Sequence, residues 1–143
     1  MPPSQASARA VFDRFLAASV ENRWDDLADL YAEDVTLEMP FTPPGAPRVT
    51  KGREELRRRF HAAAGSRRIT KVENVVVHET TDPAVVVAEF DLRQEVRGEP
   101  FVVSYVMVLT VRNGQIAHSR DYTDTAAAAE RLKAWSPAGS TAG

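Results

Sequence analysis

No cysteine occurs among the 143 residues of this chain. Disulfide bonds, thiolate nucleophiles and cysteine-ligated metal ions are therefore excluded. The chain also lacks an excess of either charge, with 18 Lys and Arg residues against 20 Asp and Glu residues. Because nucleic acids and anionic membranes attract strongly basic proteins, a net charge of −2 predicts neither of them as a partner.

Long apolar runs are missing as well. No stretch approaches the roughly 20 apolar residues that a helix needs to cross a bilayer. The first residues, Met1 to Gln5, lack the basic segment and the apolar core of a signal peptide. The three histidines do not have the spacing of metal ligands, at His61, His78 and His118. These features predict a cytoplasmic protein without a metal ion or an organic cofactor.

The first half of the chain carries helical patterns. Apolar side chains recur at helical spacing over residues 7–20, and a second, short helix is indicated from Trp24 onward. Alternating apolar residues then predict a strand over residues 35–39. Prolines keep residues 40–47 out of any helix or central strand, and another helix is expected to begin near Gly52.

After Gly65 the pattern changes to strands, which we expect over residues 69–80, 85–97, 101–111 and 115–123. The dipeptides between them, Asp-Pro, Arg-Gly and Asn-Gly, favour tight turns. Helices followed by successive antiparallel strands predict an α+β domain in which the sheet curls over the helices. We expect residues 1–135 to form this single domain, with a short helix over 125–135, and residues 136–143 to form a flexible tail.

Three segments resemble a known superfamily. Residues 15–40, 52–55 and 113–124 are similar to the SnoaL-like, or NTF2-like, proteins, which include polyketide cyclases, PhzA/PhzB-like proteins, limonene-epoxide hydrolase and ketosteroid isomerase. The resemblance implies a cone-shaped α+β barrel, in which N-terminal helices pack against a strongly curved, mostly antiparallel sheet that encloses a pocket. It also implies a homodimer. Both faces of the strand over 101–111 are largely apolar, which suits a sheet covered on two sides.

The resemblance excludes one activity of the superfamily. Matched by position, the three polar groups of ketosteroid isomerase fall on Phe15, Met39 and Met107. Because Phe and Met cannot accept the proton or stabilise the enolate oxygen, that isomerase mechanism is absent. The same substitutions predict an apolar pocket for a polyketide, a terpenoid or a polycyclic compound. We expect these three residues, with Trp24 and Phe60, to bind the substrate.

Asp121 is the strongest candidate for a catalytic residue. The segment Arg-Asp-Tyr-Thr-Asp that contains it resembles a segment of limonene-epoxide hydrolase, and the resemblance implies an acid that projects into the pocket and donates or relays a proton. Small residues share its strand face, which leaves room for a ligand beside the carboxyl group. The alternative is a structural carboxylate at a strand end, paired with Arg93 or Arg120.

Further candidates lie on the two preceding strands. Glu89 and Asp91 share one strand face with Arg93, and the resemblance aligns them with an Arg-x-Asp sequence of the epoxide hydrolase. Asp91 would then be the acidic partner of Asp121, with Glu89 as a helper. The alternative is an exposed charged face on an edge strand. Tyr105 would donate a hydrogen bond within the pocket, unless it serves only in packing.

These observations lead to two hypotheses of function. The first is a cofactor-independent enzyme that transfers protons on an apolar small molecule in natural-product biosynthesis. Its reaction would be a cyclisation, with epoxide opening, dehydration and isomerisation as alternatives, and shape alone could also fold a flexible substrate. The second is a non-catalytic small-molecule binder or accessory protein. A cluster of basic residues is interpreted as a solvated surface, Arg57–Arg59 with Arg67, Arg68 and Lys71.

Overall fold

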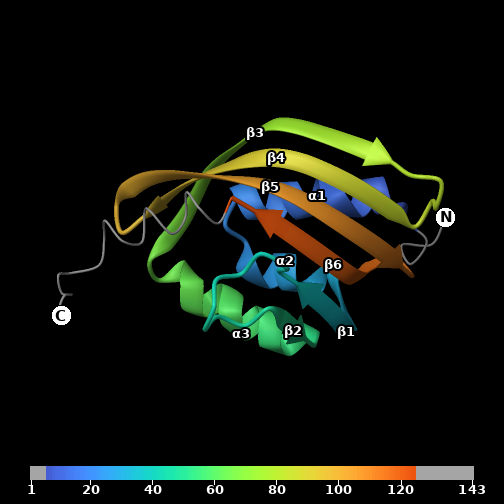
Figure 1. Ribbon diagram of the computed structural model, residues 1–143, viewed down its shortest axis with the longest axis horizontal. Helices are drawn as coiled ribbons and strands as arrows, with labels where there is room; N and C mark the ends of the chain where they lie inside the picture. Colours follow the sequence, from blue (N-terminus) through green and yellow to red (C-terminus); the bar gives the residue numbers. More distant parts are fainter. Residues whose placement is uncertain (1–5, 125–143) are drawn as a thin grey trace.

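In the computed structural model, which describes residues 6–124, three helices lie under a curved six-stranded sheet (Figure 1). The elements are α1 (Ala8–Val20), α2 (Trp24–Asp29), β1 (Tyr31–Glu38), β2 (Val49–Lys51), α3 (Arg53–Ala64), β3 (Arg67–Glu79), β4 (Val85–Val96), β5 (Glu99–Arg112) and β6 (Gln115–Thr123). The expected helix over 125–135 and the tail over 136–143 lie outside the described residues. None of the described helices has the length and apolar character that a bilayer crossing requires.

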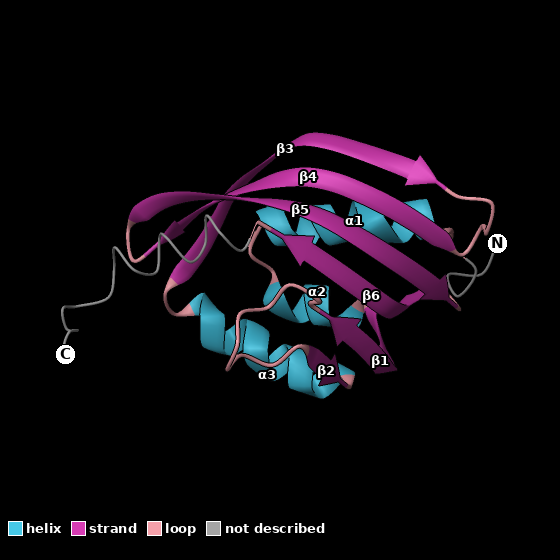
Figure 2. Cartoon of the chain, viewed as in Figure 1, coloured by secondary structure: helices cyan, strands magenta, loops and turns pink. Residues whose placement is uncertain are grey.

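The sheet is curved but not closed. Its strand order is β2-β1-β6-β5-β4-β3, with β1 and β6 parallel and all other neighbours antiparallel. Figure 2 shows β3, β4 and β5 as long strands that arch over the helices, with β2 at the opposite edge. Helix α3 contacts β1 and β2 near one edge of the sheet and β3 at the other. The helix therefore spans the open side, which gives the α+β cone expected from the resemblance.

Two of the predicted turns are tight hairpins with left-handed backbone. Arg97 and Gly98 have φ values of 53° and 82°, and Asn113 and Gly114 have 55° and 75°. Positive φ at two successive residues is the requirement of a type I′ turn, which matches the twist of the flanking strands. Two local expectations were wrong. The first strand begins at Tyr31, four residues before the start that we expected, and the short strand β2 was not predicted.

Alternation along the long strands places apolar side chains against the helices. Phe90 is buried on the inner face of β4, and its ring lies 5.9 Å from that of Phe12, a fully buried residue of α1. The outer face of β5 is also apolar, since Val102 and Val106 are 38% and 37% exposed. The two-sided apolar character predicted for this strand is therefore present, and a homodimer stays a prediction.

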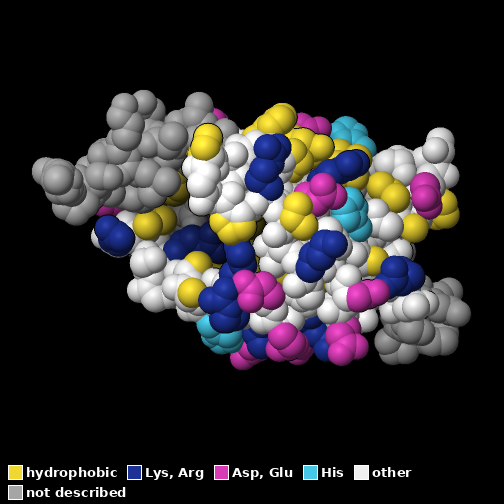
Figure 3. Space-filling model, turned by 60° about the horizontal axis from the view of Figure 1, so that its bottom comes forward, with side chains coloured by type: hydrophobic (Ala, Val, Ile, Leu, Met, Phe, Trp, Pro, Cys, Tyr) yellow, Lys and Arg dark blue, Asp and Glu magenta, His cyan; other side chains and the backbone are white. Residues whose placement is uncertain are grey.

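Most of the predicted basic cluster is neutralised by neighbouring carboxylates. Arg57 joins α3 to α2 through Asp25, at 3.0 Å, and Asp29, at 2.6 Å. Arg58 and Arg59 both pair with Glu55, one turn away on the same helix. Figure 3 shows basic and acidic side chains interspersed over the face that comes forward in that view. This part of the cluster is a network of ion pairs at a helix surface, as the sequence suggested.

Asn22 connects the segment between α1 and α2 to strand β3 through two hydrogen bonds. Its side-chain amide donates to the carbonyl oxygen of Ile69 at 2.9 Å and accepts from the Ile69 N–H at 2.8 Å, and its own φ is 56°. Replacing it with Ala removes both bonds and leaves a strained left-handed backbone. We expect Asn22→Ala to lower the free energy of unfolding by about 2 kcal/mol or more, measured by urea denaturation.

Asn22→Gly is the matched control for this prediction. Glycine loses the same two hydrogen bonds but tolerates the positive φ, so its loss of stability should be smaller than that of Ala. Equal stability of the Ala variant and the wild type would contradict the stabilising role assigned to the Asn22 side chain.

Candidate functional site

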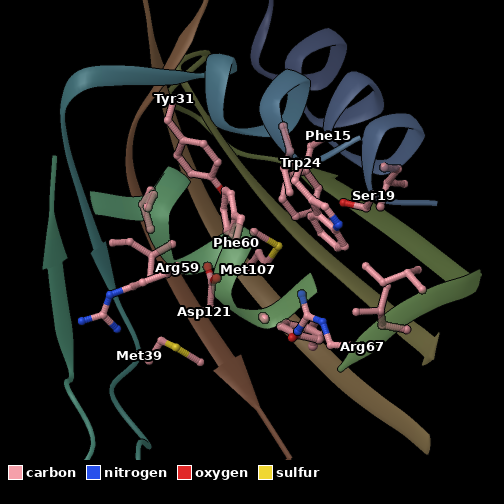
Figure 4. Close-up of a pocket in the computed structure, with 18 of the residues that line it drawn as sticks. Phe15, Ser19, Trp24, Tyr31, Met39, Arg59, Phe60, Arg67, Met107 and Asp121 are labelled. Carbon is pink, nitrogen blue, oxygen red and sulfur yellow. The ribbon is translucent and has the colours of Figure 1, made fainter. Parts of the chain in front are cut away.

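A pocket of about 250 Å³ lies between the helices and the inner face of the sheet. Figure 4 shows side chains from all three helices and from several strands converging on it. Most of the lining is apolar, and the few polar groups are therefore the ones that can orient a ligand. The polar or ionisable lining residues are Ser19, Tyr31, Thr50, Arg59, Arg67, Tyr105 and Asp121, with Trp24 contributing its indole N–H.

The structure brings the five residues expected to bind the substrate to this one pocket. All of them are lining residues, namely Phe15, Trp24, Met39, Phe60 and Met107. Trp24 and Phe60 form an aromatic wall, with ring centroids 6.3 Å apart. Aromatic and thioether groups of this kind suit the face of a polycyclic or otherwise bulky apolar compound. Their role in binding stays a prediction.

Asp121 projects into the pocket from β6, which lies between β1 and β5. The residue opposite it on β5 is Met107, and only 9% of Asp121 is exposed. The Ser119 hydroxyl, on the same strand face and fully buried, donates a hydrogen bond to Oδ1 of Asp121 at 2.5 Å. The alternative of a strand-end ion pair is not what the structure shows, since Asp121 pairs with neither Arg93 nor Arg120.

The apolar surroundings change the acidity of Asp121. Burial raises the pKa of this carboxyl from 3.8 to about 6, and the hydrogen bond from Ser119 opposes the increase. Desolvation has this effect because it disfavours the charged form. A carboxyl with such a pKa can exist as acid or as base near neutral pH, which is the requirement for a general acid–base group.

Tyr105 also reaches the pocket, from β5. Its ring stacks on that of Phe90, with centroids 5.2 Å apart, so packing accounts for part of its position. Burial raises the pKa of Tyr105 above its usual value of 10, while the nearby Arg67 lowers it. The hydroxyl is therefore protonated at neutral pH and can donate a hydrogen bond to a ligand.

Glu89 and Asp91 do not share a pocket with Asp121, which corrects the expected arrangement. Their strand β4 turns Ala88, Phe90 and Leu92 inward, so the intervening acidic side chains lie on the outer face of the sheet. This is the exposed charged face that we considered as the alternative, although β4 lies between β3 and β5 and is not the edge strand that we expected. The two acids line a separate groove, together with Ser104 and Val106.

Both outer carboxylates have local partners. Glu89 is within 2.8 Å of His78 Nε2, and Asp91 accepts hydrogen bonds of 2.7 Å from Asn74 and from Ser104. The bonds from Asn74 and Ser104 lower the pKa of Asp91. Asp91 therefore remains ionised, on the side of the sheet away from Asp121, and cannot exchange a proton with a ligand in the pocket.

Two arginines in the pocket were assigned by the sequence analysis to a solvated surface. Figure 4 shows the Arg67 guanidinium directed into the pocket and that of Arg59 directed away from its centre. A sequence signal existed for Arg67, because it stands two residues before the buried Ile69 and successive odd positions of a strand share a face. The signal was missed because Arg67 stands beside Arg68 and near Lys71, and a run of basic residues is typical of a solvated surface.

The described residues hold no group of three side chains suited to a metal ion. Each histidine is instead close to a single carboxylate. The ring nitrogen of His118 lies 2.5 Å from Glu38, and His61 lies 2.9 Å from Asp25. Neither pair lines the pocket. Among residues 6–124, the acid, the hydroxyls and the arginines listed above are thus the groups available for chemistry within the pocket.

Comparison with known proteins agrees with this architecture. The sequence profile of the SnoaL-like domain matches residues 12–119, which include α2, α3, most of α1 and nearly the whole sheet. This chain belongs to the SnoaL-like family. One relative is the PhzA/B-like protein PA3332 of Pseudomonas aeruginosa, itself uncharacterised, which is 33% identical over 97 residues. The alignment covers 66% of this chain and 67% of that protein.

Solved structures resemble the SnoaL-like chain over most of its length. A provisionally assigned isomerase from Bacillus subtilis superposes with a TM-score of 0.82, at 24% identity, over 88% of this chain and 92% of the other. A provisionally assigned polyketide cyclase from Pseudomonas putida gives 0.74, at 16% identity, over 87% and 97%. Other structures of this fold are described as phenazine-related or epoxide hydrolase proteins. At these identities the likeness establishes the fold and not the reaction.

The raised pKa of Asp121 predicts a pH-dependent cost to stability. The folded protein binds this proton more tightly than the unfolded chain, so ionising Asp121 destabilises the folded state. The free energy of unfolding of the wild type, relative to Asp121→Asn, should fall by roughly 2.4 kcal/mol between pH 4 and pH 7. Urea denaturation of both proteins across this range measures the difference and cancels the other titrating groups. A difference that does not change with pH would show that Asp121 has an ordinary pKa.

Proposed function

We propose that this SnoaL-like protein is a cofactor-independent enzyme that transfers protons on an apolar small molecule. The observation that supports this most is the placement of Asp121, a buried carboxyl group with a pKa of about 6, on the wall of an apolar pocket. A buried acid lowers the stability of a protein, and such groups are concentrated at functional sites. A merely structural residue at this position would be expected to be apolar or paired.

In this proposal Asp121 is the general acid. In its protonated form it donates to a carbonyl, epoxide or leaving-group oxygen as that oxygen gains negative charge, and it then recovers a proton from the product or from water. The Ser119 hydroxyl holds the carboxyl group and stabilises its ionised form after the transfer. Tyr105 is proposed as a second donor to the same ligand.

The aromatic walls would bind the apolar body of the substrate and exclude water from the reacting atoms. This arrangement favours ring closure, because a flexible chain that is held in a shaped cavity has already lost the entropy that cyclisation costs. We therefore propose a cyclase of natural-product biosynthesis, with epoxide opening, dehydration and isomerisation as the other reactions that one acid can serve. The family resemblance to proteins described as polyketide cyclases supports this choice.

A non-catalytic binder is the second candidate, and a specific observation favours it. Asp121 is the one carboxylate among the described residues that line the pocket, because Glu89 and Asp91 face the other way. A single acid has no second carboxylate to take the proton that many cyclisations release. In that case the pocket would hold a compound unchanged, and removing the acid would not reduce its binding.

Substitution of Asp121 distinguishes the two candidates. Purified protein is incubated with aryl epoxides and with linear aromatic β-ketoesters, and products are detected by mass spectrometry. We expect Asp121→Asn to lower the turnover of any accepted substrate by about 100-fold or more, since a general acid contributes at least that factor. Wild-type turnover should decrease as the pH rises through about 6, where Asp121 loses its proton.

Asp91→Asn is the matched control for this experiment. It makes the same chemical change on the outer face of the sheet, so turnover should stay close to that of the wild type. Unchanged turnover in a correctly folded Asp121→Asn protein would contradict the catalytic assignment. Binding of the probes by the wild type, without turnover of any of them, would favour the binder.

A further inference from the structure

Arg67 differs from every other member of the basic cluster to which it belongs. The other five pair with neighbouring carboxylates. Arg57 pairs with Asp29 of α2, and Arg58 and Arg59 both pair with Glu55 of α3. Arg68 pairs with Glu95, and Lys71 pairs with Glu73. Arg67 has no carboxylate partner among residues 6–124, and its Nε is buried without a hydrogen-bond acceptor. A buried N–H of a charged group that lacks an acceptor carries a substantial free-energy cost.

The structure fixes the position of this unpaired cation. Arg67 is the first residue of β3 and pairs with Val96 of β4, so its backbone is part of the sheet. Its guanidinium carbon lies 5.5 Å from the ring centroid of Trp24, a cation–π contact that orients the group but supplies no acceptor for its N–H donors. Figure 4 shows the guanidinium directed toward the interior of the pocket.

The groups around Arg67 indicate what kind of ligand would supply the missing hydrogen-bond acceptor. Trp24 and Arg67 line the same pocket as Tyr105, whose hydroxyl is close enough for the Arg67 charge to lower its pKa. A guanidinium offers parallel N–H donors that match the two oxygens of a carboxylate. The remaining walls are aromatic and aliphatic, so an apolar body must be attached to that anion.

We infer that the pocket binds an organic carboxylate, whose anionic group pairs with Arg67 while its apolar body lies against Trp24, Phe60 and Met107. This inference rests on the proposed function and narrows its substrate class from apolar molecules in general to apolar acids. It also orients the substrate. The carboxylate is held at the start of β3, and the far part of the molecule lies beside Asp121 on β6.

A pair of probes that differ only in charge tests the inference. The probes are 2-naphthoate, a flat apolar carboxylate, and 2-naphthamide, its neutral analogue of the same shape, with binding measured by calorimetry. We expect the wild type to bind 2-naphthoate at least about tenfold more tightly than 2-naphthamide, because a charged hydrogen-bonded pair replaces a neutral contact. Added salt should reduce this preference.

Variants of two adjacent arginines test whether Arg67 is the residue that causes the preference for 2-naphthoate. Arg67→Met keeps the apolar stem and removes the charge, so both probes should bind with similar affinity. Arg68→Met makes the same change one residue along, where the side chain is exposed and pairs with Glu95 across the strands, and it should keep the wild-type preference. Arg67→Lys should retain part of it, and circular dichroism checks that each variant is folded.

Two outcomes separate this inference from the proposed function, and a third bears on both. Equal binding of the two probes by the wild type would overturn the inference and leave an apolar pocket with Asp121 intact. A preference that survives in folded Arg67→Met would also overturn it, by showing that another group selects the anion. Failure of the wild type to bind either probe would contradict both proposals. The wild-type comparison stands even if the Arg67 variants do not fold.

Discussion

The alternation of side chains along β4, β5 and β6 is the constraint on which the site depends. A sheet that bends over three helices has one inner face, and only every second residue can reach it. This rule places Asp121 in the pocket, with Met107 opposite it, and it places Asp91 outside. The chemistry that the pocket can perform therefore follows from which strand positions hold acids, and not from how many acids the sequence contains.

Much of the fold could be predicted from the sequence, because its signals are local. The dipeptides at Arg97 and Asn113 require left-handed backbone, and hairpins formed there. The helical spacing of α1 and the alternation of the long strands were equally clear. The failures were also local. Strand β2 contains three residues beside a proline-rich segment, which is too short for a pattern, and the β1 start at Tyr31 coincides with an apolar position that also continues a helical repeat.

The site could be predicted only in part. Asp121 and the apolar lining residues were expected in the pocket, whereas the positions of Glu89, Asp91 and Arg67 were not. The alternation of Glu89 and Asp91 with Phe90 is visible in the sequence, but it leaves open which face of the strand meets the pocket. The burial of apolar surface decides it, since the Phe90 face must cover the helices. Arg67 was grouped with solvated arginines because its isolation from carboxylates is a property of three-dimensional structure, which the spacing of charges along a chain does not reveal.

The proposed chemistry requires the apolar pocket to keep Asp121 protonated to a pH at which it can act as an acid. The most direct measurement is the carbon-13 chemical shift of the Asp121 carboxyl group as a function of pH, with the signal assigned by its absence from Asp121→Asn. We expect a midpoint near pH 6. A midpoint close to 3.8, the ordinary value for aspartate, would contradict it, because the carboxyl would then be ionised and unable to donate a proton near neutral pH.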